Sequence, residues 1–201
     1  MNKKNDLLET GRKAQKKKTR KQLLQSAQDL LSLGKPFSLE DVAKHSNTSR
    51  ATVYRYFSNI DVLCSEAGLD IHTKSPDTLF DEFQHLSIIE RIIAIQNYYN
   101  QLALDNEMAF RTYLSVYLKD DKSATRGSRR VESLKLALSP VRDQIQKKEY
   151  HHLIHSATIL MGIEPMIAAK DVCQLSNEKA IETLKWTLQI LLEKTILNKV
   201  Q

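Results

Sequence analysis

The chain has 201 residues, 41% of them hydrophobic and 27% charged, a composition typical of a globular protein with room for one or two domains. Only five Gly and four Pro are present, which disfavours a turn-rich all-β architecture, and no apolar run reaches the ~20 residues of a membrane span. The polar, basic start of the chain lacks the apolar segment of a signal peptide, and Cys64 and Cys173 lack metal-ligand spacing, so we expect a reduced, cytoplasmic protein.

Positive charge is concentrated at the N-terminus. The net charge is +6, yet residues 1–64 hold 13 Lys and Arg against six Asp and Glu, whereas the remaining residues hold 17 against 18. Nine of these cations lie between Lys3 and Lys21. The asymmetry favours a polyanion-binding region attached to a nearly neutral body, although a solvated basic tail would have the same composition.

The first predicted elements are an arm and a helix. Residues 1–15 lack steady apolar periodicity, and we expect them to form a flexible basic arm. From Thr19 onward, one apolar stripe predicts a helix that ends near Gly34 and Pro36. The stripe consists of Leu23, Leu24, Ala27, Leu30 and Leu31.

Two short helices follow, over 39–46 and 50–57, and a fourth helix begins near residue 59. Ser38 and Ser49 each stand one residue before a short helix and can act as its N-cap. Asn47 lies in the tight turn between the two helices, where it tolerates a left-handed backbone better than other non-glycine residues.

Two short helices joined by such a turn form a helix-turn-helix, whose second helix enters the major groove of DNA. Val53 and Phe57 would face the core of this motif. The outward residues would carry guanidinium, phenol and hydroxyl groups, which suit phosphate and base contacts; they are Arg50, Ala51, Thr52, Tyr54, Arg55 and Tyr56. Among them Arg50 is the first candidate for a base contact, because Arg–guanine is the commonest specific pairing.

The segment SLEDVAKHSNTSRATVYRYFSNIDVL resembles the DNA-binding region of the tetracycline-repressor (TetR/AcrR) family of transcriptional regulators. The positions in register with the family pattern are Ser38, Ala43, Ser49, Thr52, Val53, Tyr54, Tyr56, Phe57 and Leu63. The resemblance implies an all-α protein with a helix-turn-helix DNA-binding domain at 16–70 and a helical effector-binding and dimerisation domain at 71–201. It implies a regulator rather than an enzyme, with no cofactor.

Three positions depart from the family pattern: Asn47 replaces the turn glycine, Thr48 the valine after it, and Ile60 the lysine before the fourth helix. In the family that lysine usually contacts a phosphate, and we expect basic residues of the first helix to replace it, namely Lys16, Lys17, Lys18, Arg20 or Lys21. Ser38 and Ser49 are also expected to contact DNA, because helix N-termini attract phosphate. The arm could follow the neighbouring minor groove.

Beyond Ser75 and Pro76 the chain is predicted to be helical, apart from a polar loop at 119–128. The predicted helices cover 80–102 with a break near Ser87, 110–118, 131–145 with a kink or restart at Ser139 and Pro140, 150–172, and 178–197. Ser176 or Asn177 could cap the last helix.

The last two helices are apolar on more than one side. The residues off their main stripes are Ile159, Ile163, Met166, Ile167, Trp186, Ile190 and Leu197. A helix with two apolar faces needs a partner for each, and family members usually dimerise through their last two helices. We therefore expect a homodimer built by residues 150–172 and 178–197, whose two-fold symmetry matches a palindromic double-stranded DNA operator.

The resemblance also implies a small-molecule effector that biases two states and releases a repressor from its operator. Candidate pocket residues are polar groups within apolar helical stretches: Tyr98, Arg111, Tyr113, Tyr117, His155 and Glu164. Each of these also has the ordinary interpretation of a satisfied core residue.

Two alternatives remain open from the residues alone. The pairs Glu82/His85 and Glu149/His152 have the E-x-x-H spacing of di-iron carboxylate bundles, but their neighbours do not place them clearly inward. A passive architectural DNA binder would share the basic arm, yet it would not need a large helical body with surplus apolar faces.

Overall fold

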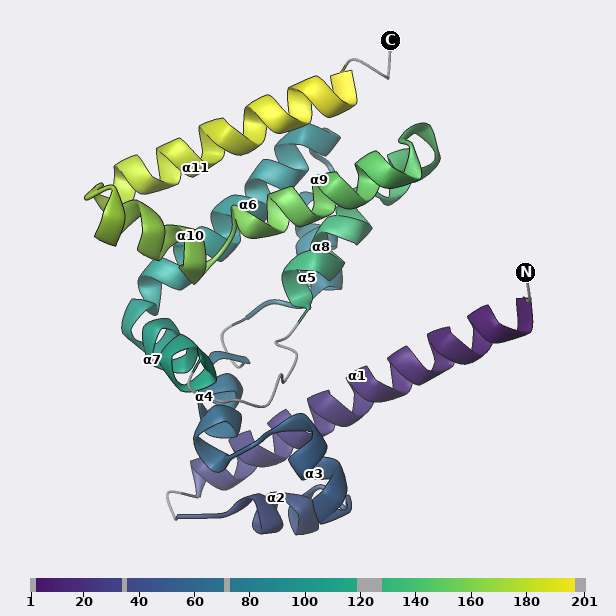
Figure 1. Cartoon of the computed structure of the whole chain (residues 1–201), viewed down its shortest axis with the longest axis vertical. Helices are drawn as coiled ribbons and strands as arrows, with labels where there is room; N and C mark the ends of the chain where they lie inside the picture. The colour runs from purple at the N-terminus through teal and green to yellow at the C-terminus, as the bar shows by residue number, and fades with distance from the viewer. Residues whose placement is uncertain (1–2, 34–35, 71–72, 119–127, 198–201) are drawn as a thin grey trace. The chain divides into compact units, whose positions relative to one another are not determined.

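The computed structural model describes residues 3–33, 36–70, 73–118 and 128–197, and every regular element within these ranges is a helix (Figure 1). The all-α fold class is therefore confirmed. The chain divides into a first unit, Met1–His72 with Arg111–Thr125, and a second unit, Thr73–Phe110 with Arg126–Gln201. The sequence predicted one division after residue 70, whereas the structure groups part of the later chain with the N-terminal residues.

The first unit contains α1 (Lys3–Ser32), α2 (Leu39–His45), α3 (Arg50–Tyr56) and α4 (Ile60–Asp70). Helix α1 packs against α4 and α2, and α2 packs against α3. Their shared core is made of aliphatic side chains and one phenylalanine: Leu23, Leu24, Ala27, Leu39, Val42, Ala43, Val53, Phe57, Val62, Leu63 and Ala67. The predicted stripe of the first helix is thus buried at Leu23, Leu24 and Ala27, while Leu31 is exposed.

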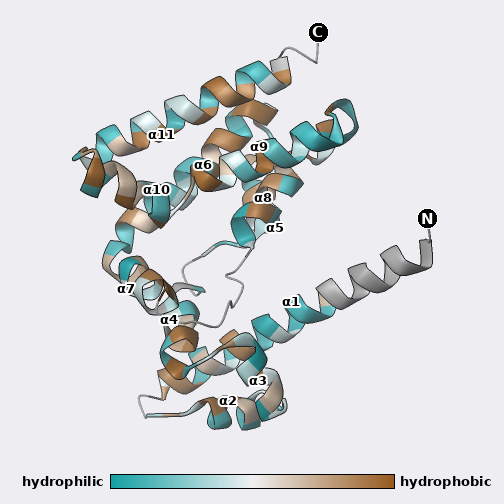
Figure 2. Cartoon of the chain, viewed as in Figure 1, coloured by the Kyte–Doolittle hydropathy of each residue, from teal (hydrophilic) through white to brown (hydrophobic). Residues whose placement is uncertain are grey.

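Helix α1 begins earlier than the sequence predicted. It is continuous from Lys3, where an arm was expected over residues 1–15. The stretch is rich in Leu, Lys, Glu, Gln and Ala, which favour helix even without an apolar stripe. Residues 14–18 are exposed and belong to the strongly hydrophilic part of α1 (Figure 2). Periodicity detects a buried face, and the sequence of residues 1–15 has no apolar stripe to mark one.

The second unit is a bundle built by α5 (Pro76–Phe83), α6 (Ile88–Asp105), α8 (Arg129–Ala137), α9 (Lys147–Ile159), α10 (Ile163–Ile167) and α11 (Asn177–Leu192). A 3₁₀ turn, η1 (Ser139–Gln144), follows α8, and the π-helical turns η2 (Ala168–Val172) and η3 (Glu193–Leu197) follow α10 and α11. Helix α6 contacts α8, α10 and α11, and α8 contacts α5 and α9. Helix α7 (Glu107–Leu118) contains the boundary between the units.

The predicted break near Ser87 is confirmed. Ser87 and Glu90 form a capping box at the start of α6, with the Ser87 hydroxyl donating to the Glu90 carboxylate at 2.6 Å. The buried Arg91 then donates to the carbonyl oxygens of Phe83, Gln84 and Leu86, so the end of α5 is also satisfied. Ser176 caps α11, as one of the two predicted alternatives, with its Oγ accepting from the backbone N–H of Lys179.

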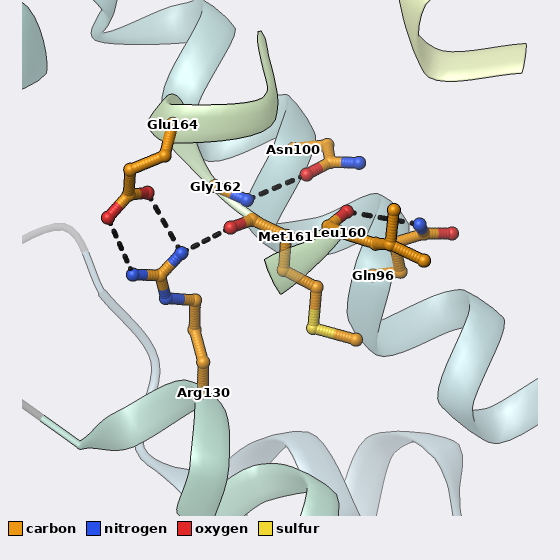
Figure 3. Close-up of polar contacts among 7 residues, drawn as sticks. All are labelled: Gln96, Asn100, Arg130, Leu160, Met161, Gly162 and Glu164. Carbon is orange, nitrogen blue, oxygen red and sulfur yellow. Dashed lines mark hydrogen bonds and ion pairs between the residues drawn. The ribbon is translucent and has the colours of Figure 1, made fainter. Parts of the chain in front are cut away.

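The single helix predicted over 150–172 is wrong, because the chain breaks between Ile159 and Ile163 (Figure 3). Gly162 has φ +88°, which only glycine adopts readily, and its N–H donates to Asn100 Oδ1 at 2.8 Å. The Gln96 amide donates to the Leu160 carbonyl at 3.1 Å. Arg130 donates to the Met161 carbonyl and to both oxygens of Glu164, at 2.9 and 3.0 Å. Side chains from α6 and α8 thus form hydrogen bonds with the backbone groups that the break leaves without helical partners.

Candidate nucleic-acid interface

Helix α2 begins with a complete capping box. The Ser38 hydroxyl accepts from the Asp41 N–H at 3.3 Å, and the Asp41 carboxylate accepts from the Ser38 N–H at 3.0 Å. Hydrogen bonds from the Ser38 hydroxyl and backbone N–H lower the pKa of Asp41. The predicted N-cap role of Ser38 is confirmed, and the Asp41 carboxylate completes the capping box.

The turn between α2 and α3 accommodates Asn47 and Thr48, the two residues that depart from the family pattern there. Asn47 has φ +52°, the left-handed conformation predicted for it. The Thr48 N–H donates to the Ala43 carbonyl at 2.9 Å, and the Thr48 hydroxyl shares a hydrogen bond of 2.8 Å with Ser46. Gln22 of α1 donates to the Ser46 carbonyl at 2.6 Å. The polar Thr48 therefore has a partner in the turn, where the family's valine would only pack.

Helix α3 is fixed at both ends and on one face. The Ser49 hydroxyl accepts from the Thr52 N–H at 3.1 Å and caps the helix, as predicted. Val53 and Phe57 are fully buried, and Phe57 ends the helix at its C-cap. The predicted inward positions of α3, Val53 and Phe57, are therefore confirmed.

The outward residues of α3 fall into two groups. Arg50, Ala51, Tyr54 and Arg55 are exposed, whereas Thr52 and Tyr56 are half-buried. The Thr52 hydroxyl shares a hydrogen bond of 2.9 Å with the Ser49 hydroxyl. Tyr56 packs against the core of the first unit, and the Arg55 guanidinium carbon lies 5.4 Å from the centre of its ring. Two arginines and one tyrosine are thus presented to solvent from a rigid helix.

One polar contact of this face was missed by the sequence analysis. The Tyr54 hydroxyl donates to Glu40 Oε1 at 2.8 Å, which joins α3 to the first turn of α2. This hydrogen bond is the main cause that lowers the pKa of Glu40 and raises the pKa of Tyr54, and the positive charge of Arg50 also lowers the pKa of Glu40. Glu40 and Tyr54 are 14 residues apart, so only the crossing of the two helices brings them together.

The basic residues of α1 have different environments. Arg20 donates to both oxygens of Glu66 on α4, at 2.9 and 2.5 Å, and its guanidinium carbon lies 4.8 Å above the Phe57 ring. Arg20 therefore links α1 to α4, and among the five alternatives for the missing phosphate contact it is one whose guanidinium already pairs with a carboxylate. The side chains of Lys16, Lys17, Lys18 and Lys21 are exposed and stay candidates for that contact.

The six candidate effector residues are distributed over both units. Tyr98, His155 and Glu164 belong to the second unit, on α6, α9 and α10, and the others, Arg111, Tyr113 and Tyr117, belong to the first. Tyr98 accepts from the Lys74 N–H at 2.6 Å, Glu164 pairs with Arg130, and His155 is exposed beside His151. Tyr113 is buried, and its ring lies 5.4 Å from that of the half-buried Tyr117. Tyr98, Glu164 and His155 thus each contact a different residue of the second unit.

The two E-x-x-H pairs are not arranged as a bundle site. Glu82, His85 and His152 are exposed, and Glu82 forms an ion pair with Lys74 at 2.6 Å. Within the described ranges no three His, Cys, Asp or Glu side chains gather where they could hold a metal ion. None of the helices in the described part of the chain has the length and apolar character needed to cross a bilayer.

Comparison with known protein families finds a match for the helix-turn-helix segment described above. Residues 35–67 match the family model described as bacterial regulatory proteins, tetR family, and this range contains the capping Ser38, the turn, α3 and the first turns of α4. No curated protein and no solved structure matches the chain. The match over residues 35–67, with a helix-turn-helix at the same residues, makes this segment similar to bacterial regulatory proteins of the tetR family and indicates a DNA-binding role for it.

Proposed function

We propose that the protein is a TetR/AcrR-type repressor that binds a palindromic DNA operator as a homodimer and is released by a small-molecule effector. The observation that carries the proposal is the exposed face of α3, where Arg50, Tyr54 and Arg55 stand out from a helix held by a cap and two buried residues. The match over residues 35–67 supports the assignment of this helix to DNA.

In the proposed complex, α3 lies in the major groove. Arg50, in the first turn of α3, reads a base, and Arg55 and Tyr54 add phosphate or base contacts. Ala51, Thr52 and Tyr56 line the same face. Ser38 and Ser49 place the N-termini of α2 and α3 against phosphates, and Lys16, Lys17 and Lys18 supply sequence-independent charge.

The proposed dimer uses the outer faces of α9 and α11. On α11, Trp186 and Ile190 are one turn apart with 64% and 44% of their surface exposed, and on α9 the exposed fraction of Ile159 is 71%. Large exposed apolar side chains on neighbouring turns support an interface with a second copy. Ile163 and Met166 are buried within the second unit, so they contribute to its core rather than to this face.

The effector is proposed to act on the helical body and to change the affinity of α3 for DNA. The candidate residues stay Tyr98, Arg111, Tyr113, Tyr117, His155 and Glu164. In the second unit Glu164 forms an ion pair with Arg130 at 2.9 Å. A charged ligand that bound to Glu164 would have to take the place of Arg130.

The experiment that tests this function is selection of duplexes from a random DNA pool by the purified protein. We expect an enriched sequence with two-fold symmetry and half-sites about 34–36 Å apart, or a multiple of that spacing. An asymmetric enriched site would contradict the dimer on a palindrome. A pool that stays random after several rounds would contradict the repressor and favour the architectural DNA binder.

A further inference from the structure

We propose that Glu40 is an internal competitor of DNA phosphate, which holds the Tyr54 hydroxyl in the free protein and must be displaced when DNA binds. The inference rests on the proposed function, since it concerns the same helix-turn-helix face. It assigns to Glu40 a regulatory role at that face: the carboxylate sets how tightly the protein holds DNA in general.

The crossing of α2 and α3 places the Glu40 carboxylate, next to the capping Asp41, beside the polar groups of α3. Glu40 is the second residue of α2, directly beside the capping box, and its Oε1 accepts from the Tyr54 hydroxyl at 2.8 Å. Tyr54 has 44% of its surface exposed, and its hydrogen bond to Glu40 lies at the surface of the unit. Arg50, one turn before Tyr54, attracts the same carboxylate.

The competition follows from hydrogen-bond chemistry. A tyrosine hydroxyl has one proton and donates it to one strong acceptor at a time. Tyrosine hydroxyls and arginine guanidinium groups are common donors to DNA phosphates. A carboxylate and a phosphodiester are both anionic oxygen acceptors, so Glu40 occupies in the free protein the donor that a phosphate would use. Two anions close together on one face also repel each other.

The cost of displacement applies to every DNA sequence. Phosphate contacts supply nearly all of the free energy of non-specific binding. A group that competes for those contacts therefore weakens binding to random DNA, where no base contact offsets the loss. Glu40 would in this way reduce retention of the protein on unrelated DNA.

The test is a double-mutant cycle on the full-length protein, with affinity for a random-sequence duplex measured by fluorescence anisotropy. We expect Glu40→Ala to raise the affinity about twofold to fivefold, the upper part of the range of a single ion-pair interaction near a surface. In a Tyr54→Phe background, the gain from Glu40→Ala should fall to half or less, because the contested proton is absent. Asp29→Ala removes one exposed carboxylate from α1 of the same unit and should change the affinity less than twofold.

Three results separate the inference from the function on which it rests. If Glu40→Ala lowers the affinity or leaves it unchanged, or if its gain is the same with Phe at position 54, the competition is refuted while DNA binding stands. If the wild-type protein shows no salt-dependent binding to any duplex, the proposed function fails and the inference fails with it. Helical content measured by circular dichroism identifies any variant that has not folded.

Discussion

At the scale of single residues, two arginines of the first unit have opposite roles because of their neighbours. Arg20 is half-buried and held by Glu66 and the Phe57 ring, whereas Arg50 is exposed at the start of α3. The outward position of Arg50 could be predicted, because the spacing of Val53 and Phe57 fixes the inward face of a short helix. The role of Arg20 could not, because its partner lies 46 residues away and four of its near neighbours in the chain, Lys16, Lys17, Lys18 and Lys21, are basic.

The role of Arg50 leads to a first prediction. Arg50→Ala should reduce affinity for the selected operator by about 1–3 kcal/mol and affinity for random DNA much less, because one base contact is lost. Anisotropy titrations on both duplexes measure the difference. Equal losses on operator and random DNA would mean that Arg50 contacts only phosphate.

At the scale of elements, most helix starts could be predicted and one helix break could not. Ser38, Ser49 and Ser176 each precede their helix and cap it, a signal that lies within four residues of sequence. The break at Gly162 depends on Gln96, Asn100 and Arg130, which lie on other helices. The apolar pattern continues through the break, so periodicity alone extended the helix.

The break at Gly162 gives a second prediction. Gly162→Ala forces a Cβ into a left-handed backbone and to 2.8 Å from Arg130 Nη1, so it should lower the melting temperature. We expect a fall of about 2–8 °C, from a strain of about 1–2 kcal/mol. Gly68→Ala is the matched control, since its Cβ meets no atom within 4 Å in α4 and Ala favours helix. Equal melting temperatures for Gly162→Ala and wild type would contradict the constraint.

The contact between α1 and α4 gives a third prediction. Arg20→Ala leaves Glu66 without its bidentate partner in a largely shielded position, where the two side chains are only 18% and 13% exposed. We expect the free energy of unfolding to fall by about 1–3 kcal/mol. Urea unfolding followed by circular dichroism measures it, and an unchanged midpoint would show that the ion pair does not stabilise the first unit.

At the scale of the whole molecule, composition and resemblance predicted the helical fold and the DNA-binding segment. The sequence predicted that the second apolar face of the last helices is left for a partner chain. In the structure Trp186 and Ile190 are exposed on such a face, whereas Ile163 and Met166 are buried within the second unit. Periodicity shows that a residue is apolar on a second face, but the second unit's own packing decides whether that face is covered. The six effector candidates rest on residue type alone, which does not specify neighbours.

The exposed face of α11 gives a fourth prediction. Trp186→Glu should convert a dimer to a monomer in sedimentation velocity, because a charge at the centre of an apolar interface is desolvated without a partner. Met108→Glu is the control, since Met108 is a more exposed apolar residue on α7, outside the proposed interface. A wild-type monomer, or dissociation by both variants, would contradict an interface through α11.

The most direct test of the central claim is the affinity of the full-length protein for the DNA immediately upstream of its own gene, measured by fluorescence anisotropy at several salt concentrations. The proposed regulator should bind that DNA far more tightly than a random duplex of the same composition, typically by a factor of about 10³ or more, and both affinities should fall as salt rises. Equal affinities for the two duplexes would contradict a specific operator at that position. The protein would then be a general DNA binder or a regulator of a distant site, and the DNA sequences selected from the random pool would decide between these two.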